Sequence, residues 1–187
     1  LRLQPGNALA WGNLGAAQQE MGATRAAISS LQQALKLRPD FAIAHTNLGF
    51  CLQSCGDHDA AIPFFERSLE LRPGNLRVLH GLGWSLLQAG HPDATILTLK
   101  QALQQAPDAA EIRLILAIAQ REARQMEAAN SSFRRCAEQA NVPEAVLAAC
   151  LEHFAVTRQT DTLEPLLKAL GAKSQSPLLL VYRAALA

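Results

Sequence analysis

Aromatic side chains are scarce in this chain and make up only 5% of its 187 residues, whereas Ala, Leu and Gln are abundant. Strands favour aromatic and β-branched residues, while Ala, Leu and Gln are good helix formers. This bias argues against a β-rich domain and predicts an all-α fold. With 49% apolar residues, the chain has enough hydrophobic surface to fold into one or two domains.

An excess of charge of either sign is also absent, because the chain has 17 basic and 16 acidic side chains and a net charge of +1. No long-range field therefore steers the protein towards nucleic acid or an anionic membrane. No apolar run reaches the roughly 18 residues that a membrane span needs. We predict neither nucleic-acid binding nor membrane insertion.

Motifs of catalysis and cofactor binding are missing as well. The sequence has no G-x-x-x-x-G-K-[ST] loop and no strand-linked G-x-G-x-x-G. Its five histidines cluster with no plausible Ser or Cys nucleophile in the sequence. We predict that this segment is not an enzyme and that it holds no cofactor.

A repeat of 34 residues organises the chain, so that positions 34 apart form a column. Its clearest markers are one set of prolines and two sets of glycines: Pro5, Pro39, Pro73 and Pro107; Gly15, Gly49 and Gly83; Gly22, Gly56 and Gly90. Apolar spacings of three to five residues within each period predict two amphipathic helices joined by a tight turn. A helix of about 14 residues is marginal alone in water, so neighbouring pairs are expected to stack.

This period predicts the domain organisation. Residues 1–7 are the end of a truncated repeat, and residues 178–187 the first helix of another. Between them lie full repeats at 8–41, 42–75 and 76–109, a weaker one at 110–143 and a degenerate helix pair at 144–177.

Glycines in the middle of predicted helices indicate close packing. A Gly there costs about 1 kcal/mol relative to Ala, yet Gly15, Gly49 and Gly83 all occupy such positions. We expect the second helix of each pair to pack on the bare backbone of the first. At the joints, Pro73 and its counterparts end a helix, and Asn7 and Asn75 are positioned to cap the next one. Asp40 and Asp108 are candidates for the same role at the other two joints, one place earlier in the repeat.

Four cysteines are present, and Cys51 and Cys55 stand four residues apart near His58, as two metal ligands would. The other periods hold mostly Ala, with Ser or Met, in these columns, so we interpret the cysteines as buried packing residues and predict no metal site. They form no disulfide framework, which favours a reducing compartment such as the cytoplasm.

The first full period resembles the tetratricopeptide repeat family, in bacterial-type arrays. The matching residues are Trp11, Leu14, Gly15, Ala27, Leu31, Ala34 and Pro39. The match weakens in 110–143, where Ala117 and Arg124 replace glycines. The resemblance implies a right-handed superhelical solenoid whose first helices line a concave groove.

The resemblance also implies which residues contact a ligand. Asn13 and Asn47 resemble an asparagine ladder that grips peptide backbone in some family members. Beyond them the groove is predicted to become apolar with a polar edge. Its further candidate residues are Phe50, Gln53, His80, Trp84, Leu87, Ile118 and Arg121. For Phe50 and Trp84, packing between first helices is the alternative role.

The predicted function is a protein- or peptide-binding scaffold or adaptor that captures an extended segment in the groove. One alternative is a non-catalytic arm of a larger transferase, such as a sulfotransferase or glycosyltransferase. Another is a structural array in which uncapped ends, at Leu1 and Leu3 and at 178–186, stack into a homo-oligomer.

Overall fold

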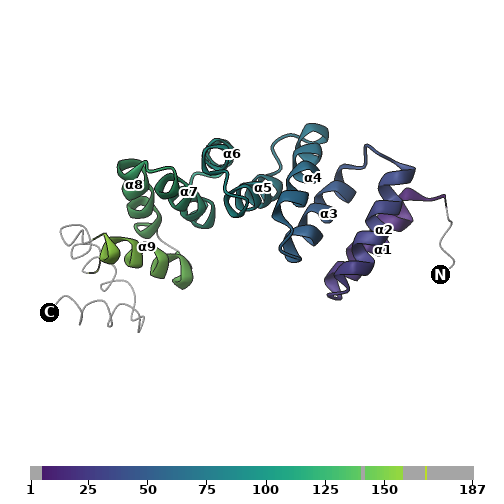
Figure 1. Cartoon of the computed structure of the whole chain (residues 1–187), viewed down its shortest axis with the longest axis horizontal. Helices are drawn as coiled ribbons and strands as arrows, with labels where there is room; N and C mark the ends of the chain where they lie inside the picture. Colours follow the sequence, from purple (N-terminus) through teal and green to yellow (C-terminus); the bar gives the residue numbers. More distant parts are fainter. Residues whose placement is uncertain (1–5, 140–141, 158–166, 168–187) are drawn as a thin grey trace. The chain divides into compact units, whose positions relative to one another are not determined.

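The computed structural model describes residues 6–139, 142–157 and 167. These residues form nine α-helices and no strand, so the all-α prediction is confirmed for them (Figure 1). The helices are α1 (Ala8–Glu20), α2 (Thr24–Leu37), α3 (Ala42–Ser54), α4 (His58–Leu71), α5 (Leu76–Gln88), α6 (Pro92–Gln105), α7 (Ala110–Glu122), α8 (Met126–Ala137) and α9 (Glu144–Val156). The predicted helix ends at 1–4 and 178–187, and most of the second half of 144–177, lie outside the described residues.

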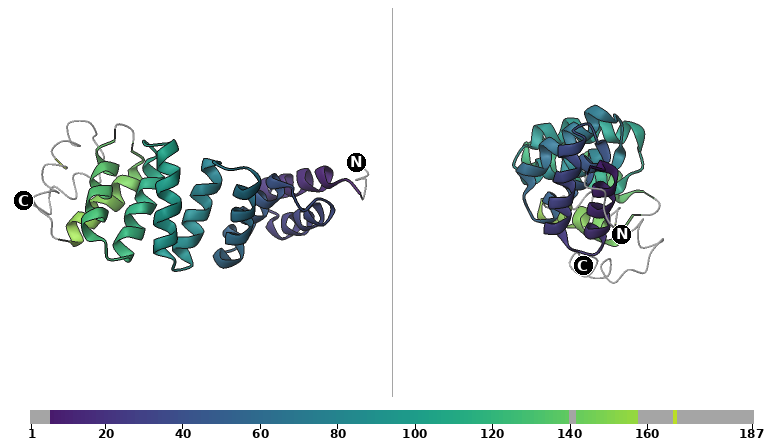
Figure 2. Two further views of the ribbon diagram at one scale, coloured as in Figure 1. Left: turned by 90° about the horizontal axis from the view of Figure 1, so that it is seen from above. Right: turned by 90° about the vertical axis from the view of Figure 1, so that its right-hand side faces the viewer.

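The 34-residue period sets where the helices begin. The odd-numbered helices begin at residues 8, 42, 76, 110 and 144, and α2, α4, α6 and α8 begin at 24, 58, 92 and 126. Consecutive helices pack against each other within each pair, as the two views of Figure 2 agree. The repeat in the sequence is therefore a repeat of helix pairs.

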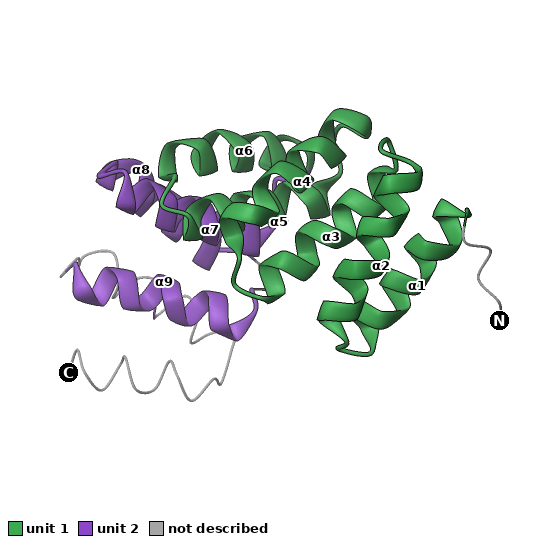
Figure 3. Cartoon of the chain, turned by 45° about the vertical axis from the view of Figure 1, so that its right-hand side comes forward, with its two compact units in different colours: residues 1–105 green, residues 106–187 purple. Residues whose placement is uncertain are grey.

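The chain divides into two compact units, which Figure 3 colours separately. Unit 1 comprises residues 1–105 with α1 to α6, and unit 2 comprises residues 106–187 with α7 to α9. Each unit has its own buried apolar side chains. The largest of these are Leu31, Leu48, Phe65, Leu79 and Leu99 in unit 1, and Phe133, Leu151 and Phe154 in unit 2.

The mid-helix glycines are where second helices approach most closely, as predicted. A Cβ at Gly49 would lie 2.8 Å from Cε1 of Phe65, and one at Gly83 would lie 2.3 Å from Cδ2 of Leu99. Gly15 has the same relation to Leu31 on α2, at 2.6 Å from Cγ. These distances are too short for real Cβ atoms, so a large side chain of the second helix occupies the space that Gly leaves.

Helix starts use two kinds of stabilising contact. The Asn7 side chain accepts hydrogen bonds from the backbone N–H groups of Leu9 and Ala10, and that of Asn75 accepts one from Val78, which confirms these two caps. Pro143 at the start of α9 provides no side-chain cap. Neither do Phe41 and Ala109, which stand at the starts of α3 and α7 in place of the predicted caps Asp40 and Asp108.

At those two starts a side chain inside the helix serves instead. His45 Nε2–H donates to the Pro39 carbonyl oxygen at 2.8 Å, and the Arg113 guanidinium donates to the Pro107 carbonyl. Both side chains are buried and stand in the column of Trp11. Where no Asn cap is present, a side chain of the helix therefore contacts the preceding proline carbonyl and stabilises the helix start.

The turn within each pair requires a left-handed backbone conformation. Gly22, Gly56 and Gly90 adopt φ of 74°, 78° and 78°, and Arg124 occupies the same column with φ 60°. Glycine adopts this region without steric cost, whereas a residue with a Cβ is strained there.

Replacing Arg124 with Gly is therefore expected to raise the free energy of unfolding by about 1 kcal/mol. Urea denaturation followed by circular dichroism measures the change. Gln125→Gly is the matched control, because Gln125 has φ −85° and gains nothing from glycine. Equal stability changes in the two variants would contradict the strain at Arg124.

Three of the four cysteines are buried as predicted, namely Cys51, Cys136 and Cys150. Burial raises the pKa of Cys51 to about 11, with a smaller contribution from Cys55. The prediction for Cys55 was wrong, because its side chain is exposed. Cys55 is the C-cap residue of α3, and Met21 in the same column is 80% exposed. The apolar character of that column therefore does not reflect burial.

Candidate functional site

The predicted asparagine ladder begins on the first two odd-numbered helices of unit 1. Asn13 is exposed on α1, and Asn47 is half-buried on α3. A carboxamide both donates and accepts hydrogen bonds, so either side chain suits a main-chain amide group. The next positions of the column, Gly81 and Ile115, are buried and carry no polar side chain. Asn therefore occupies this column in the first two repeats alone.

Phe50 fills the junction between α3 and α5. Its Cε1 would lie 2.9 Å from a Cβ at Gly81, so the ring rests on the glycine backbone. The ring meets Phe65 edge-on, with centroids 4.9 Å apart and an interplanar angle of 70°. The Arg77 guanidinium lies over the ring at 4.3 Å from its centroid. Of the two roles predicted for Phe50, the structure shows packing between first helices.

Of two other predicted groove residues, one makes contacts within unit 1 and the other is buried. The Gln53 amide donates hydrogen bonds to the Gly81 carbonyl oxygen at 3.0 Å and to Ser85 Oγ at 2.9 Å. Leu87 is 5% exposed, which leaves almost no surface for a ligand. Our expectation that Leu87 lines a groove is corrected accordingly, because its own side chain is buried although Trp84 three residues earlier is exposed.

The remaining candidates of unit 1 lie on α5. Trp84 is 37% exposed on a helix with eight buried residues, and among the described residues it is the one aromatic residue in the set of exposed large apolar side chains. His80 is half-buried one turn before it. Trp84 is thus the candidate anchor that unit 1 presents to solvent.

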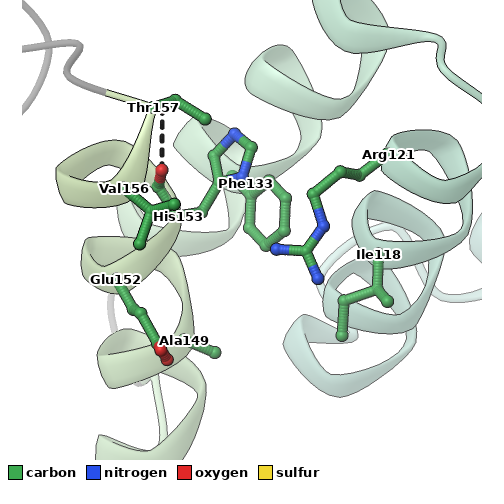
Figure 4. A pocket seen from close by; sticks show the side chains of 8 residues that line it. All are labelled: Ile118, Arg121, Phe133, Ala149, Glu152, His153, Val156 and Thr157. Carbon is green, nitrogen blue, oxygen red and sulfur yellow. Dashed lines mark hydrogen bonds between the residues drawn. The ribbon is translucent and has the colours of Figure 1, made fainter.

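Unit 2 contains a pocket of about 380 Å³ between α7, α8 and α9 (Figure 4). Its lining residues are Ile118, Arg121, Phe133, Ala149, Glu152, His153, Val156 and Thr157. The structure therefore brings together the two predicted residues of α7, Ile118 and Arg121. Sequence reasoning missed the contribution of α9, although Glu152 stands 34 residues after Ile118 in the same column.

His153 forms the inner wall of the pocket and is only 2% exposed. Its ring stacks on Phe133 with centroids 3.9 Å apart, and its Nε2–H donates to Asn130 Oδ1 at 2.7 Å. Burial, and secondarily the positive charge of Arg121, lower the pKa of His153 to about 4. The imidazole is therefore neutral at neutral pH, so His153 adds no charge to the pocket.

The described residues hold neither a metal site nor a membrane span. Within 6–139, 142–157 and 167, no group of three or more His, Cys, Asp or Glu side chains is arranged to hold a metal ion. No helix in the described part of the chain is long and apolar enough to cross a bilayer.

Comparison with protein families decides the classification. Three models described as tetratricopeptide repeat match residues 8–41, 40–108 and 80–144. Together they cover the chain continuously from residue 8 to residue 144. The chain belongs to the tetratricopeptide repeat family. No curated protein matches this tetratricopeptide chain.

Solved structures show the same solenoid fold. YrrB, a tetratricopeptide protein with an unusual peptide-binding site, has a TM-score of 0.76 at 18% identity. The match covers 97% of this chain and 94% of the YrrB chain. MamA from Desulfovibrio magneticus RS-1 has a TM-score of 0.77 at 15% identity, with coverage of 95% and 96%. MamA AMB-1 has a TM-score of 0.68 at 26% identity, with coverage of 71% and 78%. The fold is thus that of a tetratricopeptide solenoid.

Proposed function

We propose that this tetratricopeptide array is a scaffold that binds an extended peptide segment of another protein along its odd-numbered helices. Tetratricopeptide proteins bind proteins or peptides, and the fold is typically non-catalytic. The observation that carries the proposal for this chain is the exposure of Trp84, 37%, on a helix that buries eight other residues. Aromatic side chains dominate the binding energy of protein interfaces.

The polar part of the proposed site lies earlier in unit 1. Asn13 and Asn47 occupy one column, and neither side chain carries a charge. Their carboxamides are suited to the repeating N–H and C=O groups of an extended backbone, whatever its side chains. Trp84 then supplies apolar contact, so that one end of the segment is held by its backbone and another by a side chain.

The test is a selection of random 12-residue peptides on the immobilised chain, followed by fluorescence polarisation with the selected peptides. Asn47→Ala combined with Trp84→Ala is expected to weaken binding at least about tenfold, because the two groups hold different parts of the segment. Far-UV circular dichroism checks that the variant is folded.

A matched control removes a carboxamide and a large apolar side chain from even-numbered helices. Gln33 on α2 and Leu97 on α6 are both exposed, and Leu97 is 72% exposed. Gln33→Ala combined with Leu97→Ala is expected to change the affinity less than about twofold. If both double variants bind the selected peptides as the wild type does, the proposed site is wrong.

A further inference from the structure

The pocket of unit 2 and the Phe50 junction of unit 1 are equivalent places in the repeat. α3, α4 and α5 meet in one, and α7, α8 and α9 meet in the other. Each residue of the first corresponds to the residue two periods later in the second. The pairs are Phe50 and Ile118, Gln53 and Arg121, Phe65 and Phe133, Gly81 and Ala149, and Ser85 and His153.

In unit 1 this junction is closed by an aromatic ring. Phe50 rests on Gly81 and meets Phe65 edge-on, with a guanidinium over its face. Gln53 ties α3 to α5 through two hydrogen bonds. The chain thus supplies its own occupant for the space between these helices.

In unit 2 the same junction is left open. Ile118 stands where Phe50 would be, and its shorter side chain fills less of the space. Arg121 replaces the tying Gln53, and its guanidinium lies 6.0 Å from the centroid of Phe133. The result is the pocket of about 380 Å³, with Arg121 and Ile118 on one side and α9 on the other (Figure 4).

We propose that this pocket of unit 2 receives an aromatic side chain of a peptide ligand, in the place that Phe50 fills in unit 1. The inference rests on the peptide-binding function proposed above and names one determinant of the ligand. Ile118 and Val156 offer apolar walls, and Phe133 and His153, which are 1% and 2% exposed, close the pocket from within. Arg121 is the cation for the face of the ring, as Arg77 is for Phe50.

Charge gives the pocket little other selectivity. Arg121 and Glu152 carry opposite charges and both line it, so neither an acidic nor a basic side chain is favoured by the pair. His153 is neutral and buried. Shape and aromatic contact therefore decide the occupant.

The experiment observes the pocket directly by NMR of Ile, Ala and Val methyl groups. N-acetylphenylalaninamide is titrated to about 10 mM, well above a dissociation constant on the order of 1 mM expected for so small a ligand. The methyl signals of Ile118, Ala149 and Val156 are expected to shift to saturation. N-acetylleucinamide at the same concentrations is expected to shift them at least about fivefold less.

Two isoleucine variants complete the test. Ile118→Phe places a ring in the pocket from within, so the Ala149 methyl signal should no longer respond to the probe. Ile43→Phe is the matched control, because Ile43 is 47% exposed on α3 and the same ring there leaves the pocket empty. In that control the response should match the wild type.

Several outcomes would overturn the proposal: equal shifts with the leucine probe, no saturable shift, or a response that survives in Ile118→Phe. Shifts that grow with the concentration of the protein alone would assign the pocket to a second copy instead. The function proposed above is judged separately, by the Asn47 and Trp84 variants and selected peptides. If the methyl signals of the pocket do not respond while the Asn47 and Trp84 variants weaken peptide binding, only this inference is wrong. If the pocket responds and those variants bind the selected peptides as the wild type does, only the earlier site is wrong.

Discussion

Replacing Gly49 with Leu is expected to unfold the region around α3 and α4. The first added atom alone would lie 2.8 Å from Cε1 and 2.9 Å from Cδ1 of Phe65, which is fully buried. Neither the ring nor the α3 backbone can withdraw without separating the pair. We expect a loss of about 3 kcal/mol or more in the free energy of unfolding, at the upper end for overpacking.

Thermal and urea denaturation followed by circular dichroism measure this loss. Ala26→Leu is the matched control, since Ala26 is exposed on α2 and should tolerate the same side chain within about 0.5 kcal/mol. Gly49→Ala is expected to fall between the two, because it introduces only the first of the clashing atoms. Thermal stability of Gly49→Leu equal to that of the wild type would disprove the packing role of these glycines.

Acidification from pH 6.5 to pH 4 is expected to destabilise unit 2 through His153. The pKa of His153 falls from its ordinary 6.5 to about 4 in the folded chain, so the unfolded chain binds the additional proton in this range. The contribution of His153 to stability is therefore complete above about pH 6.5 and is lost as the pH falls. The full shift corresponds to about 3 kcal/mol, and we expect about 2 kcal/mol because the neighbouring pocket admits solvent.

His153→Gln is the comparison that isolates this effect. Glutamine does not titrate and can still donate a hydrogen bond to Asn130, although it loses the stacking on Phe133. Its stability at pH 7 should be lower than that of the wild type, and the difference should shrink towards pH 4. Carboxylates titrate equally in both proteins, so parallel curves of unfolding free energy against pH would refute the role of His153.

The helix pairs were predictable from sequence because the repeat supplies its own controls. A mid-helix Gly that returns every 34 residues has a common cause, and the contacts of Gly15, Gly49 and Gly83 confirm it. The Asn caps were predictable for the same reason, since Asn7 and Asn75 follow the same joint. These features depend on residues within one 34-residue period, so the repeated sequence shows them directly.

Which residues of each first helix are exposed to solvent was harder to predict. Phe50 was a candidate for ligand contact, but it packs because Gly81 on the next first helix leaves room for it. Leu87 was assigned to the groove and is buried. Exposure at these positions depends on a neighbour 30 or more residues away, which no single column of the repeat records. The pocket wall on α9 was missed because the fifth period has lost the family signature.

Two kinds of contact alternate at the starts of the first four odd-numbered helices. Asn caps occur at residues 7 and 75, and the side-chain contacts to a proline carbonyl occur at 45 and 113. Each kind recurs after two repeats over the first four odd-numbered helices, and Pro143 at the start of α9 ends this alternation. Removing residues 42–109, which are two repeats, would place Arg113 beside Pro39 in the position that His45 now has. Removing a single repeat instead joins a helix to a proline turn of the other kind.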